Sequence, residues 1–241
     1  GSAFGAAVAD ARGARFGGIA VLGSRAWPGA RCPLCGDATP IALPEVRGRA
    51  YAECGVCGLS FMRPSDWPSA ERARAEYGLH HNAIDDAGYR RFLDRLAAPL
   101  CERLAPAAHG LDYGCGPGPA LVAMLRERGF DCLGYDPLFA AHPERLQVRY
   151  DFVCCTEVAE HFTDPSAEFE RLRGLLAPGG WLALMTQWRR DDHAFDQWRY
   201  VHDPTHVAVY RERSLRWIAD RLGLAYESPA PNVCLMRAPA A

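Results

Sequence analysis

The sequence predicts a doubly wound α/β sheet preceded by a small cysteine module and a helical connector. From about residue 109 onward, short apolar runs alternate with segments of helical pattern, which is typical of strands joined by helices. Upstream, two CxxC pairs precede a segment of helical character. The 241 residues therefore divide into an irregular segment (1–30), the cysteine module (31–64), the connector (65–105) and the α/β domain (106–241).

The elements after the module follow from their hydrophobic period. Two helices are expected in the connector, over 69–80 and 89–104, the second with an apolar stripe. In the α/β domain, strands are predicted over 109–114, 130–136, 150–155 and 181–187, and helices over 119–129, 165–176 and 211–223. Two last strands, 224–228 and 233–237, are expected to provide an antiparallel edge.

The composition is that of an ordinary globular protein, with 49% hydrophobic and 23% charged residues. A net charge of −2 provides no general attraction to nucleic acid or to an anionic membrane. No apolar run approaches the roughly 20 residues that span a bilayer, and residues 1–30 lack the pattern of a signal peptide. We expect a cytoplasmic monomer or homodimer that makes no use of a membrane.

The paired cysteines have the spacing of a structural zinc site. Cys32 and Cys35 form one CxxC pair, Cys54 and Cys57 form the other, and 18 residues lie between the pairs. Four thiolates complete a tetrahedron and leave no open position, so zinc here is predicted to stabilise the fold and not to catalyse. Redox activity or simple packing are the competing interpretations. The other six cysteines lie in apolar patterns and are predicted to pack in the core.

The loop LDYGCGPGP joins the first α/β strand to a helix and predicts a nucleotide-cofactor site. Its glycines allow a tight turn and close approach of a ligand to the backbone. Twenty-two residues after Gly114, the next strand ends at Asp136, where a carboxylate would accept hydrogen bonds from ribose hydroxyls. NAD fits less well, because Pro119 stands where the dinucleotide fingerprint has its third glycine.

The loop from Asp112 to Gly118 resembles that of the class I S-adenosylmethionine (SAM) methyltransferases, which have a Rossmann-like sheet. YDFVCCTEVAEHFTDP resembles the fourth-strand motif of that family, and LLAPGGWLALMT resembles its turn into strand five. The resemblance covers about residues 75–241. It implies SAM as the cofactor, with Asp112 near the methionine ammonium and Asp136 on the ribose diol. The residues expected at the cofactor are Asp112, Gly114, Cys115, Gly116, Gly118, Asp136, Pro137, Thr156, Glu157 and Tyr77.

The chain further resembles a bacterial subgroup of that family with a zinc-binding N-terminus. Two signatures carry this resemblance: Y-x-x-H-x-N, present as Tyr77, His80 and Asn82, and DPTHV from Asp203 to Val207, followed by Tyr210.

One departure from the family concerns the segment after the second strand. Only 14 residues separate Asp136 from Asp151, where fuller members have a helix, a third strand and an acidic adenine contact. No residue is therefore assigned to the adenine amino group. Leu138 or Phe139 is a candidate for apolar adenine contact, with a place in the core as the alternative.

Residues 188–210 leave the fifth strand at the edge where doubly wound sheets bind ligands, and they are predicted to form a lid over the acceptor. The aromatic residues of this insert are expected either to line the acceptor pocket or to support the lid; they are Trp188, Phe195, Trp198, Tyr200 and Tyr210. The candidates for acceptor contact are His80, Asn82, Trp198, His202 and Tyr210.

Three interpretations compete for Glu157, Glu160 and His161 in the segment TEVAEH. The acids simply begin a short helix at its positive end; or Thr156 and Glu157 border the SAM pocket while His161 is a base; or His206 joins all three to bind a second divalent metal. The last set resembles metal-dependent methyltransferases that modify the 3′-terminal ribose of small RNAs. The candidate catalytic residues are His206, His161 and Glu157.

The sequence thus predicts an enzyme that transfers a methyl group from SAM to a small or medium polar acceptor through a C, N, O or S atom that stays unassigned. The alternative is an RNA-modifying methyltransferase whose zinc module grips RNA through nearby arginines. Few aromatic residues accompany these arginines and the total charge is acidic, which disfavours that alternative. A non-catalytic scaffold is the third hypothesis, disfavoured by the intact glycine loop.

Overall fold

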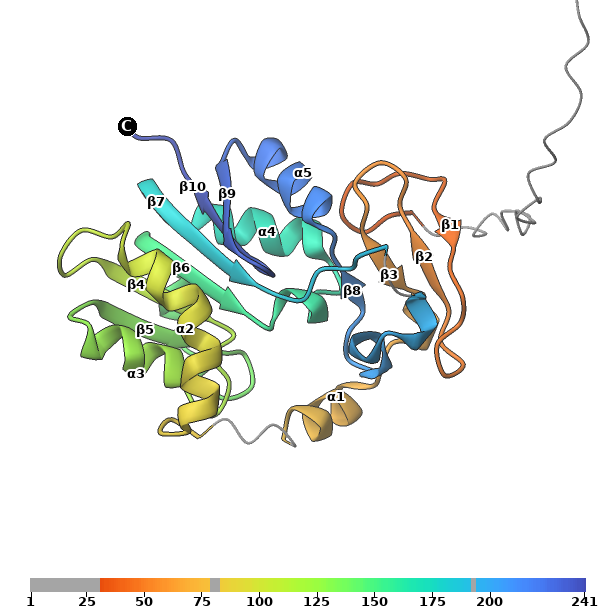
Figure 1. Ribbon diagram of the computed structural model, residues 1–241, viewed down its shortest axis with the longest axis horizontal. Coiled ribbons are helices and arrows are strands. Elements are labelled where there is room, and N and C mark those ends of the chain that lie inside the picture. The colour runs from red at the N-terminus through yellow and green to blue at the C-terminus, as the bar shows by residue number, and fades with distance from the viewer. Residues whose placement is uncertain (1–30, 79–82, 192–193) are drawn as a thin grey trace, which may run out of the picture.

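The computed structural model describes residues 31–78, 83–191 and 194–241, and its main sheet has six strands (Figure 1). Their order is β5 (Asp131–Tyr135), β4 (His109–Tyr113), β6 (Tyr150–Thr156), β7 (Leu176–Met185), β10 (Val233–Arg237) and β9 (Ala225–Ala230). The first four strands are parallel, and β10 is antiparallel to both of its neighbours. The predicted α/β sheet with an antiparallel edge is confirmed.

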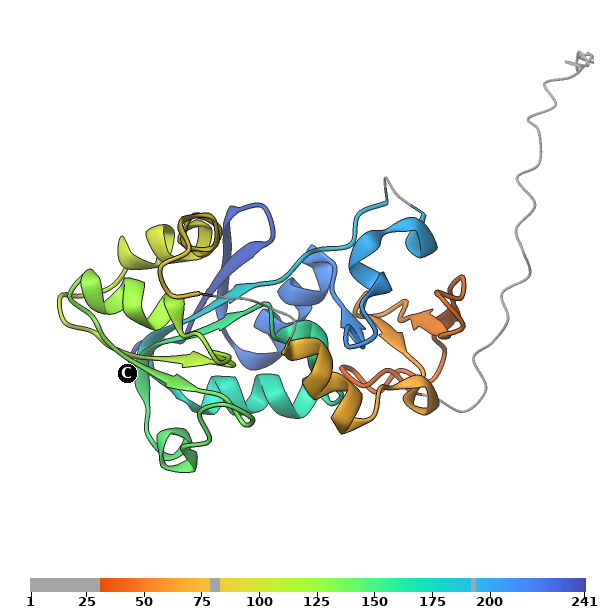
Figure 2. The ribbon, with the colours of Figure 1, turned by 90° about the horizontal axis from the view of Figure 1, so that it is seen from below.

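Helices cover both faces of this sheet (Figure 2). α2 (Ala87–Cys101) and α3 (Ala120–Glu127) pack on one face, and α4 (Pro165–Gly174) and α5 (Glu212–Leu222) pack on the other. Side chains alternate along a strand, so Phe152 and Cys154 of β6 contact the α2 side and Val153 and Cys155 contact the α4 side. Burial of both faces explains the apolar run from Phe152 to Cys155 in β6.

Four of the six single cysteines are core residues, as predicted, whereas Cys101 and Cys115 are only partly buried. Cys132, Cys154, Cys155 and Cys234 are fully buried, and all ten cysteines are free thiols. Burial raises the pKa of the Cys154 and Cys155 thiols well above the usual value. These side chains therefore pack and do not act as nucleophiles.

The ends of α4 differ in how well the sequence located them. Asp164 caps the helix, since its carboxylate accepts a hydrogen bond from Ala167 N at 3.0 Å. The helix was expected to continue to residue 176, but it ends at Gly174. Leu175 O accepts from Tyr150 N at 2.8 Å, so the chain pairs with β6 from this point on and the helix ends.

The segment between β5 and β6 is short, as the sequence indicated. It contains a 3-10 helix, Pro143–Gln147, and β5 is an edge strand among the strands of the described ranges. Asp136 and Ala140 exchange backbone hydrogen bonds of 3.2 and 3.0 Å, which fold the chain back just after β5.

The cysteine module is a small antiparallel sheet completed by a distant segment. β1 (Ile41–Ala42), β2 (Tyr51–Glu53) and β3 (Ser60–Met62) pair in that order, and β3 also pairs with β8 (Ala208–Val209). Figure 1 shows β8 beside β3, although it follows β7 in the chain. The insert predicted as a lid is therefore in part a strand of the module, which joins module and α/β domain into one core.

α1 (Ala70–Tyr77) follows the module and is capped by Ser69, whose hydroxyl accepts from Arg72 N at 3.2 Å. It corresponds to the first helix predicted in the connector.

Of the helices in the described ranges, none combines the length and apolarity required to cross a membrane.

Candidate active site

The glycine loop between β4 and α3 has a backbone that favours glycine. Gly114 has φ 83° and Gly116 has φ 63°. A Cβ atom on Gly114 would lie 2.4 Å from Cγ2 of Val158, so there is also no room for a side chain at this position. A Cβ atom on Gly116 would meet no atom within 4 Å, which leaves the backbone there open to a ligand.

Asp136 ties the glycine loop to the segment that follows β5. Its Oδ2 accepts a hydrogen bond from Gly116 N at 3.1 Å, and its Oδ1 accepts from Leu138 N at 2.8 Å and Phe139 N at 3.1 Å. A carboxylate oxygen has two lone pairs, so Oδ2 keeps one acceptor position for a ligand hydroxyl. The side chain is nevertheless largely buried, with 9% of the residue exposed.

A cavity of about 700 Å³ lies at the carboxyl ends of β4, β5 and β6, within the size range of cofactor and small-molecule sites. Leu138 and Phe139 line it and are 41% and 38% exposed, so they form its wall and are not core residues. The other predicted residues found in the wall are Gly114, Cys115, Gly116, Asp136, Pro137, Thr156, Glu157, Glu160, His161, His206 and Tyr77.

Two residues predicted at the cofactor, Asp112 and Gly118, are not part of the cavity wall. Asp112 is 4% exposed at the end of β4. Burial, and to a smaller extent Asp136, raise the pKa of the Asp112 carboxyl from 3.8 to about 7. Asp112 is thus a buried acid at the end of β4, and its contact with the methionine ammonium stays a prediction.

Glu160, His161 and His206 form a cluster in the wall. One donor atom of each side chain lies within 4.8 Å of the other two, and the two imidazole centroids are 5.0 Å apart. Burial lowers the pKa of His206, which favours the neutral imidazole. A neutral imidazole can accept a proton or bind a cation.

The set of four ligands predicted from the sequence is reduced to three, because Glu157 is not part of this cluster. A helix from Glu157 to His161 would place Glu157, Glu160 and His161 on one face. Instead Glu157 has φ 51° and precedes a 3-10 helix of three residues, Ala159–His161. Burial, followed by the charge of Glu160, raises the pKa of Glu157 to about 9, so this cavity-lining carboxyl is protonated at neutral pH.

The residues predicted for the acceptor lie elsewhere or outside the described ranges. Tyr210 is fully buried and its hydroxyl donates to Ala159 O at 3.0 Å. His202 donates through Nε2 to Asp196 O at 2.9 Å, and Trp198 lines a separate cavity of about 220 Å³. His80 and Asn82 belong to the part of the chain that the structure does not describe.

Several residues of the wall were missed by the sequence analysis. Tyr113 and Tyr135 are the last residues of β4 and β5, and this position at the ligand edge was the available signal. Tyr89 and Phe92 of α2 had no such signal, because their spacing is that of an ordinary core stripe. Of the aromatic residues in the insert, Tyr200 lines the large cavity.

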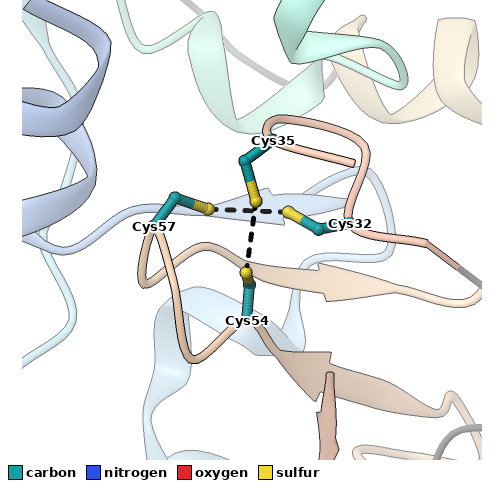
Figure 3. A group of neighbouring side chains, drawn as sticks. All are labelled: Cys32, Cys35, Cys54 and Cys57. Carbon is teal, nitrogen blue, oxygen red and sulfur yellow. Dashed lines mark hydrogen bonds between the residues drawn. The ribbon is translucent and has the colours of Figure 1, made fainter. Parts of the chain in front are cut away.

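The four paired cysteines converge on one point (Figure 3). The Sγ atoms of Cys32 and Cys57 are 3.5 Å apart, and those of Cys35 and Cys54 are 3.4 Å apart. Tetrahedral zinc with Zn–S bonds of 2.3 Å places sulfur atoms about 3.8 Å apart, close to these separations. In each pair the first cysteine accepts at its carbonyl from a glycine N–H at 2.9 Å; these glycines, Gly36 and Gly58, both have positive φ, which suits a tight turn.

Comparison with known proteins agrees with this geometry. A family model described as a methyltransferase domain matches residues 82–228, which is more than half of the chain. The chain belongs to this methyltransferase domain family. The matched range contains the glycine loop, Asp136 and the whole Glu160, His161 and His206 cluster.

Curated relatives of this methyltransferase domain include two ubiquinone biosynthesis O-methyltransferases. That of Acinetobacter baylyi is 35% identical over 101 residues, 32% of this chain and 42% of the relative; that of Leptothrix cholodnii is 33% identical over 101 residues, 32% of this chain and 43% of the relative. The chain thus spans less than half the length of these relatives.

A solved structure has the same Rossmann-like fold at low identity. It is the 1,6-didemethyltoxoflavin-N1-methyltransferase of Burkholderia thailandensis, with a TM-score of 0.52 and 16% identity, over 82% of this chain and 99% of that one.

Proposed function

We propose that this methyltransferase domain transfers the methyl group of SAM to a small or medium polar acceptor. The observation that carries the proposal is the single cavity of about 700 Å³, which joins the glycine loop and Asp136 to the Glu160, His161 and His206 cluster. One end has the features of a nucleotide site, and the other has groups that can accept a proton. The Burkholderia thailandensis relative of similar fold was solved with bound S-adenosylhomocysteine, which supports the same cofactor here.

The residues at the loop end fit SAM. The open backbone at Gly116 offers room for a ligand, and the free lone pair of Asp136 Oδ2 suits a ribose hydroxyl. The exposed side chains of Leu138 and Phe139 provide apolar surface for adenine. The rings of Tyr113 and Tyr135, with centroids 5.4 Å apart, add further apolar surface to the same wall. When bound, SAM supplies an electrophilic methyl group on a sulfonium.

The residues at the other end have the tasks of orienting the acceptor and taking its proton. Methyl transfer is a displacement in line, so alignment in a confined cavity contributes much of the rate. His206 is the proposed base because burial favours its neutral form, with His161 as the alternative. The ring of Tyr77 packs edge-on against His161, with centroids 5.1 Å apart, and restricts water on that side.

We assign structural Zn²⁺ to Cys32, Cys35, Cys54 and Cys57. All four side chains are at least partly buried, and one sulfur atom of each lies within 4.8 Å of those of the other three. Zinc binds four such cysteines as thiolates, and four sulfur ligands leave no position for substrate. The zinc therefore supports the fold of the module.

The alternative of an RNA-modifying enzyme has weaker support. Arg49, one of the arginines considered for gripping RNA, donates to Val201 O at 3.1 Å and to His202 O at 2.9 Å, so it is engaged inside the protein. A gel shift with tRNA or rRNA fragments tests this alternative. RNA binding that weakens strongly as salt rises would favour it, because phosphate contacts depend on salt, and no shift at low salt would count against it.

Calorimetry on cofactor-stripped protein tests the proposal. We expect SAM and S-adenosylhomocysteine to bind with a stoichiometry of one per chain. Absence of binding for both ligands, in protein that is folded by circular dichroism, would overturn the proposed function. A screen of phenol, carboxylate and amine acceptors with radiolabelled SAM then identifies the acceptor class.

A further inference from the structure

We propose that Glu160, His161 and His206 bind a divalent cation in the wall of the large cavity, through one carboxylate oxygen and the Nε2 atoms of both imidazoles. One possible ligand atom of each side chain already lies within 4.8 Å of those of the other two, and an ion with bonds of about 2.1 Å would draw the ligands closer. The role of such an ion rests on the proposed function, whereas its binding site stands on contacts that are independent of SAM.

The first observation is a buried carboxylate oxygen of Glu160 that has no hydrogen-bond partner among the described residues. Glu160 is 1% exposed, and its Oε2 accepts a hydrogen bond from Thr186 Oγ1 at 2.9 Å. Within the described residues, Oε1 is buried and has no hydrogen-bond partner. An unpaired buried oxygen of this kind is costly, and a bound cation is a partner that removes the cost.

The second observation is the orientation of the two imidazoles. Nδ1 of His161 lies 3.0 Å from Thr205 O, and Nδ1 of His206 lies 2.7 Å from Tyr200 O. A carbonyl oxygen can only accept, so Nδ1 of each ring carries a proton, which leaves Nε2 as the nitrogen that can offer a lone pair to a cation. Histidines that bind metals are fixed in this way by a carbonyl at the other ring nitrogen.

Each of the three side chains is therefore held by a hydrogen bond to another residue. The Thr186 hydroxyl donates to Glu160, so it accepts in turn from the Tyr200 hydroxyl at 2.8 Å. The chain from Tyr200 to Thr186 to Glu160 leaves Oε1 as the free atom. A proton-transfer pair would need one oriented histidine, whereas here two imidazoles and a carboxylate are each held by a separate partner.

The chemistry of the ligands limits the ion. Two imidazoles and one carboxylate suit Zn²⁺, Fe²⁺, Mn²⁺ or Co²⁺, while Mg²⁺ and Ca²⁺ prefer oxygen ligands throughout. Three protein ligands leave at least one position open toward the cavity. If the proposed function holds, an oxygen atom of the acceptor occupies that position. The bound ion then orients the acceptor and favours loss of its proton, and it takes the place of the base role that His206 has without an ion.

Cobalt titration of the protein with zinc in the cysteine site tests the inference. We expect one Co²⁺ to bind per chain, with visible d–d absorption and without the sulfur-to-metal charge-transfer band that exchange into the cysteine site would give. His206→Ala and Glu160→Gln are expected to weaken Co²⁺ binding at least 100-fold, and Thr186→Val about 10- to 100-fold as an outer-shell change.

His109→Ala is the matched control, because this histidine pairs with Asp131 at the opposite end of the sheet and should leave Co²⁺ affinity unchanged. Thermal denaturation verifies that each variant is folded. Absence of Co²⁺ binding in the wild type, or equal binding by His206→Ala and Glu160→Gln, would refute the site. Calorimetry with S-adenosylhomocysteine on the same proteins is an independent test. If S-adenosylhomocysteine does not bind while Co²⁺ does, the proposed function is refuted and the cation site is not.

Discussion

The rings of His161 and His206 lie with their centroids 5.0 Å apart, and the cysteine module holds the second of them in place. His161 follows β6, whereas His206 belongs to the insert whose strand β8 pairs with β3 of the module. The Tyr51 hydroxyl of β2 donates to His206 O at 3.3 Å, and Met62 N of β3 donates to Val207 O at 2.8 Å. The module therefore contributes to the cavity without lining the proposed cofactor end.

The role of Asp136 predicts that Asp136→Asn weakens binding of S-adenosylhomocysteine by 10-fold or more, about 1.4 kcal/mol. The amide keeps the shape of the side chain but replaces one carboxylate oxygen, which accepts from the loop and from a ribose hydroxyl, by a donor. Calorimetry measures the affinity.

Asp131→Asn is the control for this measurement, because Asp131 lies at the other end of β5 with its side chain 65% exposed. Similar affinities for Asp136→Asn and the wild type would place the ribose elsewhere.

The parts of the fold that the sequence predicted are those with a local cause. β6 and α4 are marked by an apolar run and by a capping aspartate, and the glycine loop by two residues with positive φ. β8 could not be predicted, because two residues have no period and its pairing with β3 joins distant segments. The cluster was only partly predicted: the left-handed turn at Glu157 breaks the helical spacing that had included this residue.

Asp112 predicts a stability that depends on pH. Burial raises its pKa from 3.8 to about 7, so the folded protein binds this proton more tightly than the unfolded chain does. Stability from this group is full below about pH 4 and is lost as the pH rises to about 7, by at most about 4 kcal/mol. Asp112→Asn should therefore raise the melting temperature at pH 8 and change it little at pH 4. A variant that melts lower than the wild type at pH 8 would contradict this assignment.

Glu53 predicts a large loss of stability at the junction of module and insert. Its carboxylate accepts from Arg189, Arg211 and Arg213, and the first two arginine side chains are each only 13% exposed. Glu53→Ala leaves the buried Arg189 without its carboxylate partner and leaves Arg211 paired with the exposed Asp191, so it should cost about 3–5 kcal/mol in urea unfolding.

Glu212→Ala provides the comparison, since its pair with Arg216 on α5 is exposed and is worth about 0.3–0.5 kcal/mol. Equal effects of Glu53→Ala and Glu212→Ala would mean that the buried cluster of charges contributes nothing to docking of the insert.

The coupling between the module and the insert predicts that zinc affects the distant cluster. If zinc occupies the cysteine site as proposed, Cys54→Ser should remove it, which elemental analysis measures, and should lower the melting temperature by several degrees, because the module would lose the ion that joins its two turns. Since β3 and Tyr51 hold the segment of His206, the same variant should also weaken Co²⁺ binding at the Glu160, His161 and His206 site. Cys101→Ser, in a cysteine of α2 outside the module, should change neither property. Loss of zinc from Cys54→Ser with unchanged Co²⁺ affinity would show that the insert keeps its position on the contacts of the α/β domain alone, such as the hydrogen bond from Val207 N to Glu160 O.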